Sequence, residues 1–235
     1  MSTTVKTRAI AIRADDLTVT YGGGVAAVSD VSIEVAAGEV VTLLGANGAG
    51  KTSTLMALAG AVKNSGGTVE ILGNATSAPL HRRARMGMGL LTEERCIFSR
   101  LTVRENLRIG QGDPDTALEY FPELADHLDR TAGLLSGGQQ QMLALGRVLA
   151  ASPKVILADE LSLGLAPVIV QRLLTAIRAA ADEGVAVLLV EQHVNLALEK
   201  ADRAYIMRRG RIVYSGAADE LRASPETVAK LYLEA

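Results

Sequence analysis

The feature that most constrains this sequence is the segment VVTLLGANGAGKTSTLMAL, residues 40–58. An apolar run leads into a glycine-rich loop, and a helical pattern follows, which is the context that gives G-x-x-x-x-G-K-[ST] a physical mechanism. The glycines let successive backbone N–H groups turn toward one concavity at the positive end of the helix. The segment therefore predicts a cradle for a triphosphate. At average residue usage, a chain of this length matches the pattern by chance roughly once in a hundred sequences.

Two side chains of this loop carry specific roles. We expect Lys51 to reach the β and γ phosphates as a point charge, and the Thr52 hydroxyl to ligate Mg²⁺. The alternative interpretation is a glycine-rich turn with an incidental lysine, and the strand and helix on either side weigh against it. The residues predicted to bind the nucleotide here are Gly45, Asn47, Gly48, Ala49, Gly50, Lys51, Thr52 and Ser53.

Short runs rich in Val, Ile and Leu recur at residues 40–44, 155–158 and 185–190, and each leads through a turn into a helical pattern. This is how buried parallel strands look in a sequence. The helical patterns cover residues 51–61, 139–151 and 168–181. Alternating strands and helices predict a doubly wound α/β core with a parallel sheet.

Three other segments depart from this alternation. Residues 17–21 and 31–35 alternate polar and apolar side chains, as half-exposed antiparallel strands do, so we expect a small antiparallel β layer. Between about residues 92 and 150, polar helical segments with glycine and proline breaks replace the strand pattern, which predicts an inserted helical lobe. The tail contains Ser224 and Pro225, a cap and a first-turn proline that predict a terminal helix.

Composition limits the fold and its partners. With 235 residues, 49% of them hydrophobic, the chain can bury a sizeable core as one domain. Its net charge of −2 gives no general attraction to nucleic acid or anionic lipid. The single cysteine, Cys96, cannot form an internal disulfide and is typical of a reducing, cytosolic compartment. We expect no export signal, and the apolar runs fall far short of the roughly 20 residues that span a bilayer.

A second chemical pattern is KVILADEL, in which a buried strand ends with two adjacent carboxylates, Asp159 and Glu160. Neighbouring strand residues point to opposite faces, so the pair can perform two different tasks. We expect Asp159 to hold Mg²⁺ through a water, and Glu160 to face the attacking water as general base. Acidic residues at strand ends are commonly only solvated, but a phosphate loop earlier in the chain favours the functional interpretation.

His193 follows the strand pattern VAVLLVEQ at its carboxyl end, the edge where ligands of open α/β sheets collect. An isolated histidine is more often a packing or surface residue. Here His193 is a candidate to hydrogen-bond the γ phosphate and to sense its loss, while the role of base is assigned to Glu160.

The segment LLSGGQQQ, residues 134–141, places Ser136, Gly137 and Gly138 where a helix begins. By itself this is a capped helix with a glycine turn. Between the phosphate loop and the acid-tipped strand, however, LSGGQ resembles the signature of the ATP-binding cassette (ABC) ATPases. The order of motifs along nearly the whole chain matches that family. The resemblance implies a P-loop ATPase fold and adds Gln139 to the nucleotide contacts.

In that family the signature lies in the helical lobe and faces the nucleotide of a partner, because two chains pack head to tail. The resemblance implies that one chain supplies half of each of two ATP sites. ATP would close the dimer and hydrolysis reopen it, since a ligand shifts an equilibrium only by its differential affinity. It also implies one cassette over residues 1–235, with a core lobe at about 1–92 and 152–235 and a helical lobe at about 93–151.

Other positions receive a family role by resemblance. Tyr21 matches the aromatic residue that stacks on adenine, although by itself it is equally an ordinary edge-strand aromatic. His193 matches the switch histidine, and SLGLAP, residues 162–167, resembles the loop that reports across the dimer interface. Glu93 stands where the wider family has a glutamine joining the lobes, and its carboxylate oxygen can serve the metal shell as an amide oxygen does.

Glu93 and the segments LSGGQQQMLALGRVL and SLGLAPVIV resemble the ATPases of high-affinity branched-chain amino-acid importers. Two positions depart from the pattern. Leu161 replaces the usual proline after the acid pair, which removes a fixed φ beside the proposed base. Ser99 replaces the proline of the segment that meets the membrane partner in this subgroup.

The resemblance therefore implies the ATP-hydrolysing subunit of an importer of branched-chain or related amino acids, using ATP and Mg²⁺ at the cytoplasmic face of the membrane. Expected partners are a second ATPase subunit, identical or a sister chain, separate transmembrane permeases and, indirectly, a substrate-binding protein, without nucleic acid. Importers of urea or amides are alternatives. A soluble cassette protein outside transport lacks support from a tandem cassette, a coiled-coil insertion or a basic surface. Intact Lys51, Asp159 and Glu160 disfavour a binding-only regulatory cassette.

Overall fold

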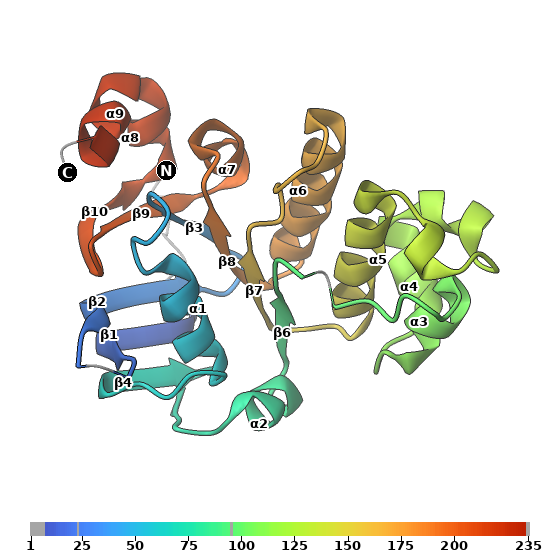
Figure 1. The fold of residues 1–235 in the computed structure, drawn as a ribbon, viewed down its shortest axis with the longest axis horizontal. Coiled ribbons are helices and arrows are strands. Elements are labelled where there is room, and N and C mark those ends of the chain that lie inside the picture. Colours follow the sequence, from blue (N-terminus) through green and yellow to red (C-terminus); the bar gives the residue numbers. More distant parts are fainter. Residues whose placement is uncertain (1–7, 23, 95, 234–235) are drawn as a thin grey trace, which may run out of the picture.

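The structure, a computed structural model, describes residues 8–22, 24–94 and 96–233; the outermost residues of the predicted cassette, 1–7 and 234–235, lie outside this range. Within it, a six-stranded sheet has the order β10-β9-β3-β8-β7-β6, and a four-stranded sheet has the order β2-β1-β4-β5 (Figure 1). The strands are β1 (Ile10–Thr20), β2 (Ala26–Ala36), β3 (Val40–Leu44), β4 (Gly66–Ile71), β5 (Asn74–Ala75), β6 (Met88–Leu91), β7 (Val155–Asp159), β8 (Ala186–Glu191), β9 (Arg203–Arg208) and β10 (Arg211–Ala217).

The six-stranded sheet forms the centre of the molecule. Strands β6, β7, β8, β3 and β9 pair in parallel, and β10 is antiparallel to β9. Every residue of β3, β7 and β8 is buried. Strands that are covered on both faces need near-continuous apolar runs, which is the pattern seen in the sequence of these three strands. The predicted α/β core with a parallel sheet is confirmed.

The four-stranded sheet is antiparallel, as predicted, but its first two strands are far longer than the sequence pattern indicated. Both β1 and β2 span 11 residues. Their pairing shifts register between Ala14 and Leu17, where Asp16 adopts φ +51°. Such a bulge changes which residues face inward, so no single alternating pattern continues along the whole strand.

The helices cover the sheet and form a separate group at one end of the molecule (Figure 1). They are α1 (Lys51–Ala59), α2 (Leu80–Arg85), α3 (Val103–Ile109), α4 (Pro114–Tyr120), the 3-10 turns η1 (Pro122–His127) and η2 (Ala132–Leu134), α5 (Gly137–Ala150), α6 (Pro167–Asp182), α7 (Val194–Lys200), α8 (Ala218–Ala223) and α9 (Pro225–Leu233). The terminal helix begins at the predicted proline.

Helices α3, α4 and α5 make up the group at the end of the molecule. Phe121 is fully buried there, and a Cβ at Gly146 of α5 would lie 3.4 Å from its ring and 3.3 Å from Ala117. The small residue therefore lets α4 and α5 pack closely. Between β6 and β7 the described residues form helices, turns and one isolated bridge between Thr102 and Thr131.

The order of the central strands brings three carboxyl ends together. Strand β8 lies between β3 and β7, with Leu44 opposite Glu191 and Asp159 opposite Val190. The glycine-rich loop leaves β3 and the acid pair ends β7. Side chains that are more than a hundred residues apart in the chain thus meet at the edge where open α/β sheets bind ligands.

Candidate functional site

Two glycines of the glycine-rich loop, Gly45 and Gly50, lie so close to neighbouring backbone that a larger residue would clash. A Cβ on Gly45 would lie 2.4 Å from the Met207 carbonyl oxygen, and one on Gly50 would lie 2.6 Å from the Ala27 carbonyl oxygen. Gly50 is also the N-cap of α1, with φ +105°, and no side chain caps the helix there. The first N–H groups of α1, which have no partner within the helix, are therefore directed at the loop, where an anion binds well.

Lys51 lies across this loop and is only 4% exposed. Its ammonium donates to the Gly45 carbonyl at 2.8 Å and to the Ala46 carbonyl at 3.2 Å. Burial lowers the pKa of Lys51, and the negative charges of Glu160, Asp159 and Glu191 oppose that effect. The charge is thus balanced by carboxylates nearby, and the side chain is already placed beside the phosphate cradle.

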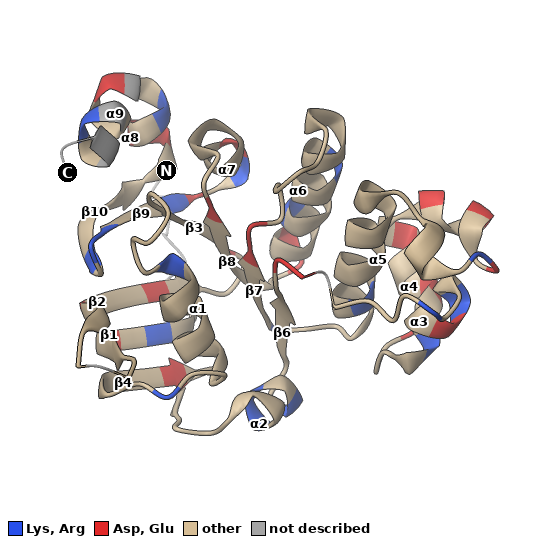
Figure 2. Cartoon of the chain, viewed as in Figure 1, with Lys and Arg blue, Asp and Glu red and all other residues tan. Residues whose placement is uncertain are grey.

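A cavity of about 600 Å³ opens in front of the loop, a size that suits a cofactor or nucleotide. Basic and acidic residues gather here, because a basic residue opens α1 and acidic residues follow β6 and β7 (Figure 2). The lining residues are Ala27, Asn47, Gly48, Gly50, Lys51, Thr52, Ser53, Glu93, Glu160, Leu163 and Gln192. Four separate parts of the predicted site therefore meet in one place.

Asp159 provides a test of the predicted metal site. It is 3% exposed, the Thr52 hydroxyl is close enough to its carboxylate to lower its pKa, and its Oδ1 has no hydrogen-bond partner among the described residues. Burial raises the pKa of Asp159, and the charges of Glu160 and Glu93 add to that shift while Lys51 opposes it. A hydroxyl and a carboxylate with a free oxygen are hard ligands that suit Mg²⁺.

The described residues contain no group of three or more His, Cys, Asp or Glu side chains that would hold a metal by protein ligands alone. Mg²⁺ is usually bound by one or two side chains together with water and phosphate oxygens. Thr52, Asp159 and Glu93 fit such a site.

Glu160 is held in an unusual conformation. Its φ is +48°, a left-handed value that is costly for a residue with a side chain. Its N–H donates to the Val190 carbonyl at 2.9 Å, and its carboxylate accepts a hydrogen bond from the Gln192 amide. The next residue, Leu161, is 1% exposed and belongs to the hydrophobic core, so the leucine that replaces proline here has a packing role.

The structure does not bring His193 into the cavity. His193 is exposed and forms the N-cap position of α7, while the residue before it, Gln192, lines the cavity and contacts Glu160. The role of His193 as a switch stays a prediction. Sequence reasoning missed Gln192, although the same signal that selected His193, a polar residue at the carboxyl end of β8, applies equally to it.

Tyr21 lies beside the first turn of α1, and its role in stacking on the base stays a prediction. It is 46% exposed, and its hydroxyl donates to Ser53 Oγ at 3.2 Å. An exposed ring beside the first turn of α1 leaves its face open for stacking.

The LSGGQ segment opens α5 and is ordered by its own side chains. Gln139 N–H donates to Ser136 Oγ at 3.3 Å, and Ser136 N–H donates to Gln139 Oε1 at 3.0 Å, which completes a capping box. A Cβ on Gly138 would lie 2.8 Å from Ile169 of α6. Among the described residues that line the 600 Å³ cavity, none comes from this segment, so the chain does not bring its own two anion-binding elements together.

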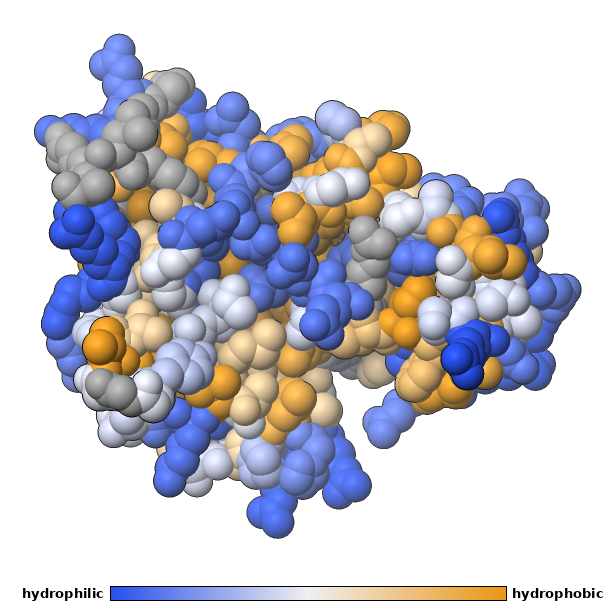
Figure 3. All heavy atoms as spheres, in the orientation of Figure 1, coloured by the Kyte–Doolittle hydropathy of each residue, from blue (hydrophilic) through white to orange (hydrophobic). Residues whose placement is uncertain are grey.

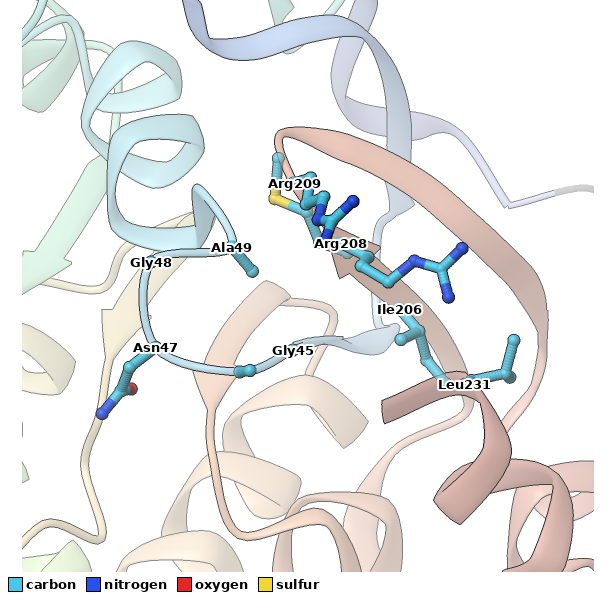
Figure 4. Close-up of a pocket in the computed structure, with 10 residues that line it drawn as sticks. Gly45, Asn47, Gly48, Ala49, Ile206, Arg208, Arg209 and Leu231 are labelled. Carbon is cyan, nitrogen blue, oxygen red and sulfur yellow. The ribbon is translucent and has the colours of Figure 1, made fainter. Parts of the chain in front are cut away.

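A smaller cavity of about 160 Å³ lies on the reverse side of the loop, between it, the end of β9 and α9 (Figure 4). Ala49, Arg208 and Leu231 are among the residues around it. The Gly210 N–H donates to the Ala49 carbonyl at 2.8 Å. The turn between β9 and β10 therefore holds this side of the loop.

A glycine loop with a buried lysine after one parallel strand, together with two carboxylates at the end of another strand of the same sheet, defines a P-loop nucleotide-hydrolysing protein. Comparison with known proteins identifies its family. The ABC transporter family model matches residues 28–162, so the chain belongs to the ABC transporter ATP-binding family. Members of this family bind nucleotide and hydrolyse ATP to drive transport, and their ATPase domains dimerise and pair with membrane permeases.

Individual relatives differ in what they transport. The chain is 45% identical over 217 residues to BraG of Pseudomonas aeruginosa, a high-affinity branched-chain amino acid transport ATP-binding protein, covering 88% of this chain and 93% of the relative. It is 38% identical over 218 residues to LptB of Escherichia coli strain K12, a lipopolysaccharide export system ATP-binding protein, covering 88% and 90%. The fold is similar to the ADP conformation of MJ1267, a cassette of an ABC transporter, with TM-score 0.83, 25% identity and coverage of 96% and 99%.

Proposed function

We propose that this chain is the ATP-hydrolysing subunit of an importer for branched-chain or related amino acids. The observation that carries the hydrolytic part is the meeting of Lys51, Glu160 and Glu93 in one cavity, beside buried Asp159. Similarity to BraG and the presence of glutamate at position 93 support the cargo class. Importers of urea or amides and a soluble cassette outside transport are the rival functions.

The side chains divide the chemistry as follows. Lys51 and the N–H groups at the start of α1 bind the β and γ phosphates, and Tyr21 stacks on the adenine. Thr52, Asp159 and Glu93 would hold Mg²⁺, which would neutralise developing charge on the phosphates. Glu160 accepts the proton of the attacking water. Tyr21 and Ser53 are linked by a hydrogen bond, so the base and phosphate contacts are adjacent.

We propose that Ser136, Gly137, Gly138 and Gln139 contact the nucleotide of a second cassette. The segment is absent from the lining of the nucleotide cavity of its own chain. Apolar side chains beside this segment, within the SLGLAP loop and just after that loop are exposed: Leu134 is 67%, Leu163 is 44% and Val168 is 72% exposed. Hydrophobic residues reach the surface at several points of the face shown in Figure 3. A closing dimer would cover such residues.

We propose two lobes, a core lobe at about 1–92 and 152–235 and a helical lobe at about 93–151. Between them lies a groove of about 470 Å³, lined in part by Met88, Cys96, Gln111 and Arg147. This groove, close to Ser99, is where we place the permease contact. No helix in the described ranges is both long and apolar enough to cross a membrane, and attachment through permeases at the cytoplasmic face meets that limit.

Measurement of ATPase activity in Glu160→Gln tests the hydrolytic mechanism. The loss of a general base lowers kcat by about a hundredfold to ten-thousandfold. Unchanged turnover would remove Glu160 from the mechanism.

The cargo class needs a separate test. The complex of this chain with its permeases and binding protein, reconstituted in vesicles, should hydrolyse ATP faster with leucine than with urea. Stimulation by urea, or by lipopolysaccharide as the similarity to LptB would suggest, would contradict the amino-acid assignment.

A further inference from the structure

Several hydrogen bonds join the segment that follows β7 to the end of β8. The Glu160 N–H donates to the Val190 carbonyl at 2.9 Å. Two residues later, Ser162 donates to Glu191 through its N–H at 3.0 Å and through its hydroxyl at 2.6 Å. The Gln192 amide donates to the Glu160 carboxylate. Three consecutive residues of β8 and its end therefore hold the segment that contains the proposed base.

Glu191 and Gln192 bind different residues of this segment because neighbouring side chains of an extended chain point in opposite directions. Glu191 is 3% exposed and Ser162 is 4% exposed, so their contact is internal and both carboxylate oxygens are used. Gln192 instead lines the nucleotide cavity. One residue anchors the backbone of the segment, and the next reaches the reactive carboxylate.

We propose that Gln192 is a positioning residue for Glu160, an inference that rests on the proposed role of Glu160 as base. Its amide donates to Oε1 of the carboxylate and leaves Oε2 to accept a proton from water. An amide is neutral at every accessible pH, so it orients the carboxylate without competing for the proton. The buried contact between Glu191 and Ser162 keeps the two strand ends in register while this happens.

The backbone of Glu160 explains why such a tie is needed. At φ +48° the residue occupies a conformation that its side chain disfavours, and the carboxylate projects from a turn rather than from the strand. His193 does not hold the Glu160 carboxylate in this arrangement, because His193 is exposed and is not among the described residues that line the nucleotide cavity. Gln192 is the residue that holds the carboxylate at a defined angle to the phosphate loop.

The experiment compares Gln192→Leu and Gln192→Glu with Glu160→Gln by steady-state ATPase kinetics and ATP titration. Leucine removes the donor, and glutamate keeps the side-chain length but accepts only. Both should lower kcat about tenfold, the effect of one hydrogen bond to a charged group. In Gln192→Leu the KM and the Kd for ATP should stay near the wild-type values, whereas the added negative charge of Gln192→Glu in the cavity should weaken ATP binding. Asn195→Ala, an exposed change in α7, is the matched control and should leave kcat unchanged.

A second readout separates positioning from a loss of structure. If Gln192 acts on the chemical step alone, Gln192→Leu with Mg²⁺ and ATP should accumulate the closed dimer, as we also expect of Glu160→Gln, and gel filtration should detect it. A merely structural defect would weaken the dimer instead.

Wild-type kcat in either Gln192→Leu or Gln192→Glu would overturn the inference. Should one variant fail to fold, the other decides. Full activity in Glu160→Gln would instead refute the proposed base, so the two failures are distinguishable.

Discussion

Two helix starts in this molecule differ in how their N–H groups are satisfied. Helix α1 begins after Gly50 with no side-chain cap, whereas α5 begins with a reciprocal capping box between Ser136 and Gln139. The first can receive phosphate oxygens without breaking any protein hydrogen bond at its cap. The second is already ordered before a nucleotide or a partner arrives.

The two helix starts therefore serve different tasks. Lys51 lies at the start of α1 beside carboxylates that balance its charge, while the LSGGQ segment contains no charged side chain. A cationic, uncapped helix start provides affinity; a neutral, preformed one provides a contact that depends on correct geometry. We therefore expect changes at the loop to affect binding, and changes at the LSGGQ segment to affect closure.

The largest expected effect is from Lys51→Ala. Removal of one partner from a buried set of charges weakens ATP binding by about 2 to 5 kcal/mol. Isothermal titration calorimetry measures the affinity, and Lys154→Ala, at an exposed lysine, is the matched control. Unaltered ATP affinity in Lys51→Ala would show that the glycine loop is not the phosphate site.

Alanine substitutions at two glycines of the loop distinguish the effect of a steric clash from the effect of backbone strain. Both have positive φ, but a Cβ on Gly50 would meet the Ala27 carbonyl oxygen at 2.6 Å, while nothing lies within 4 Å of one on Gly48. Gly50→Ala should lower the free energy of unfolding by about 2 to 4 kcal/mol, from strain and overpacking together. Gly48→Ala should lower it by about 1 to 2 kcal/mol from strain alone. Urea denaturation checks both; equal losses would show that the contact with Ala27 is relaxed.

Gly138→Ala tests the other helix start. The added Cβ would lie 2.8 Å from Ile169 Cγ2, which should lower the free energy of unfolding by about 1 to 2 kcal/mol, partly offset by the better helix propensity of alanine. ATP affinity of the monomer should not change, but ATP-dependent dimerisation should weaken. Ile169→Ala in the same chain should restore it. Weaker ATP binding by the monomer would place the LSGGQ segment in the chain's own site.

The smallest expected effect concerns the buried acid. Burial raises the pKa of Asp159 above its ordinary value, so folding costs free energy when the carboxylate is ionised. Stability from this group is therefore present at low pH and is lost as pH rises through the folded-state pKa. Asp159→Asn should raise the free energy of unfolding of the nucleotide-free protein on the order of 1 kcal/mol at neutral pH.

The pH dependence supplies the check on this last prediction. The gain in stability should shrink when denaturation is repeated at mildly acidic pH. A gain that is independent of pH would show that ionisation of Asp159 is not its cause.

Local motifs predicted much of this molecule because they need only neighbouring residues. The glycine loop, α1, the acid pair and the parallel strands all follow from short, continuous patterns. The lengths of β1 and β2 did not, since a bulge near Asp16 interrupts the alternation on which the prediction depends.

At the end of β8 the sequence could not show which of two neighbouring polar residues faces the cavity. The sequence selected His193, whereas the structure directs its neighbour Gln192 to the cavity. Which of two adjacent residues faces a ligand depends on where a strand ends and how the turn leaves it. The contact of Glu191 with Ser162 joins residues that are 29 apart in the chain, and no local pattern marks it.

The most direct test of head-to-tail pairing is the structure of the Glu160→Gln protein trapped with Mg²⁺ and ATP. We predict two chains, with Ser136 and Gln139 of each contacting the nucleotide on the glycine loop of the other. A trapped assembly in which this segment faces solvent, or stays packed against its own chain away from any nucleotide, would contradict it.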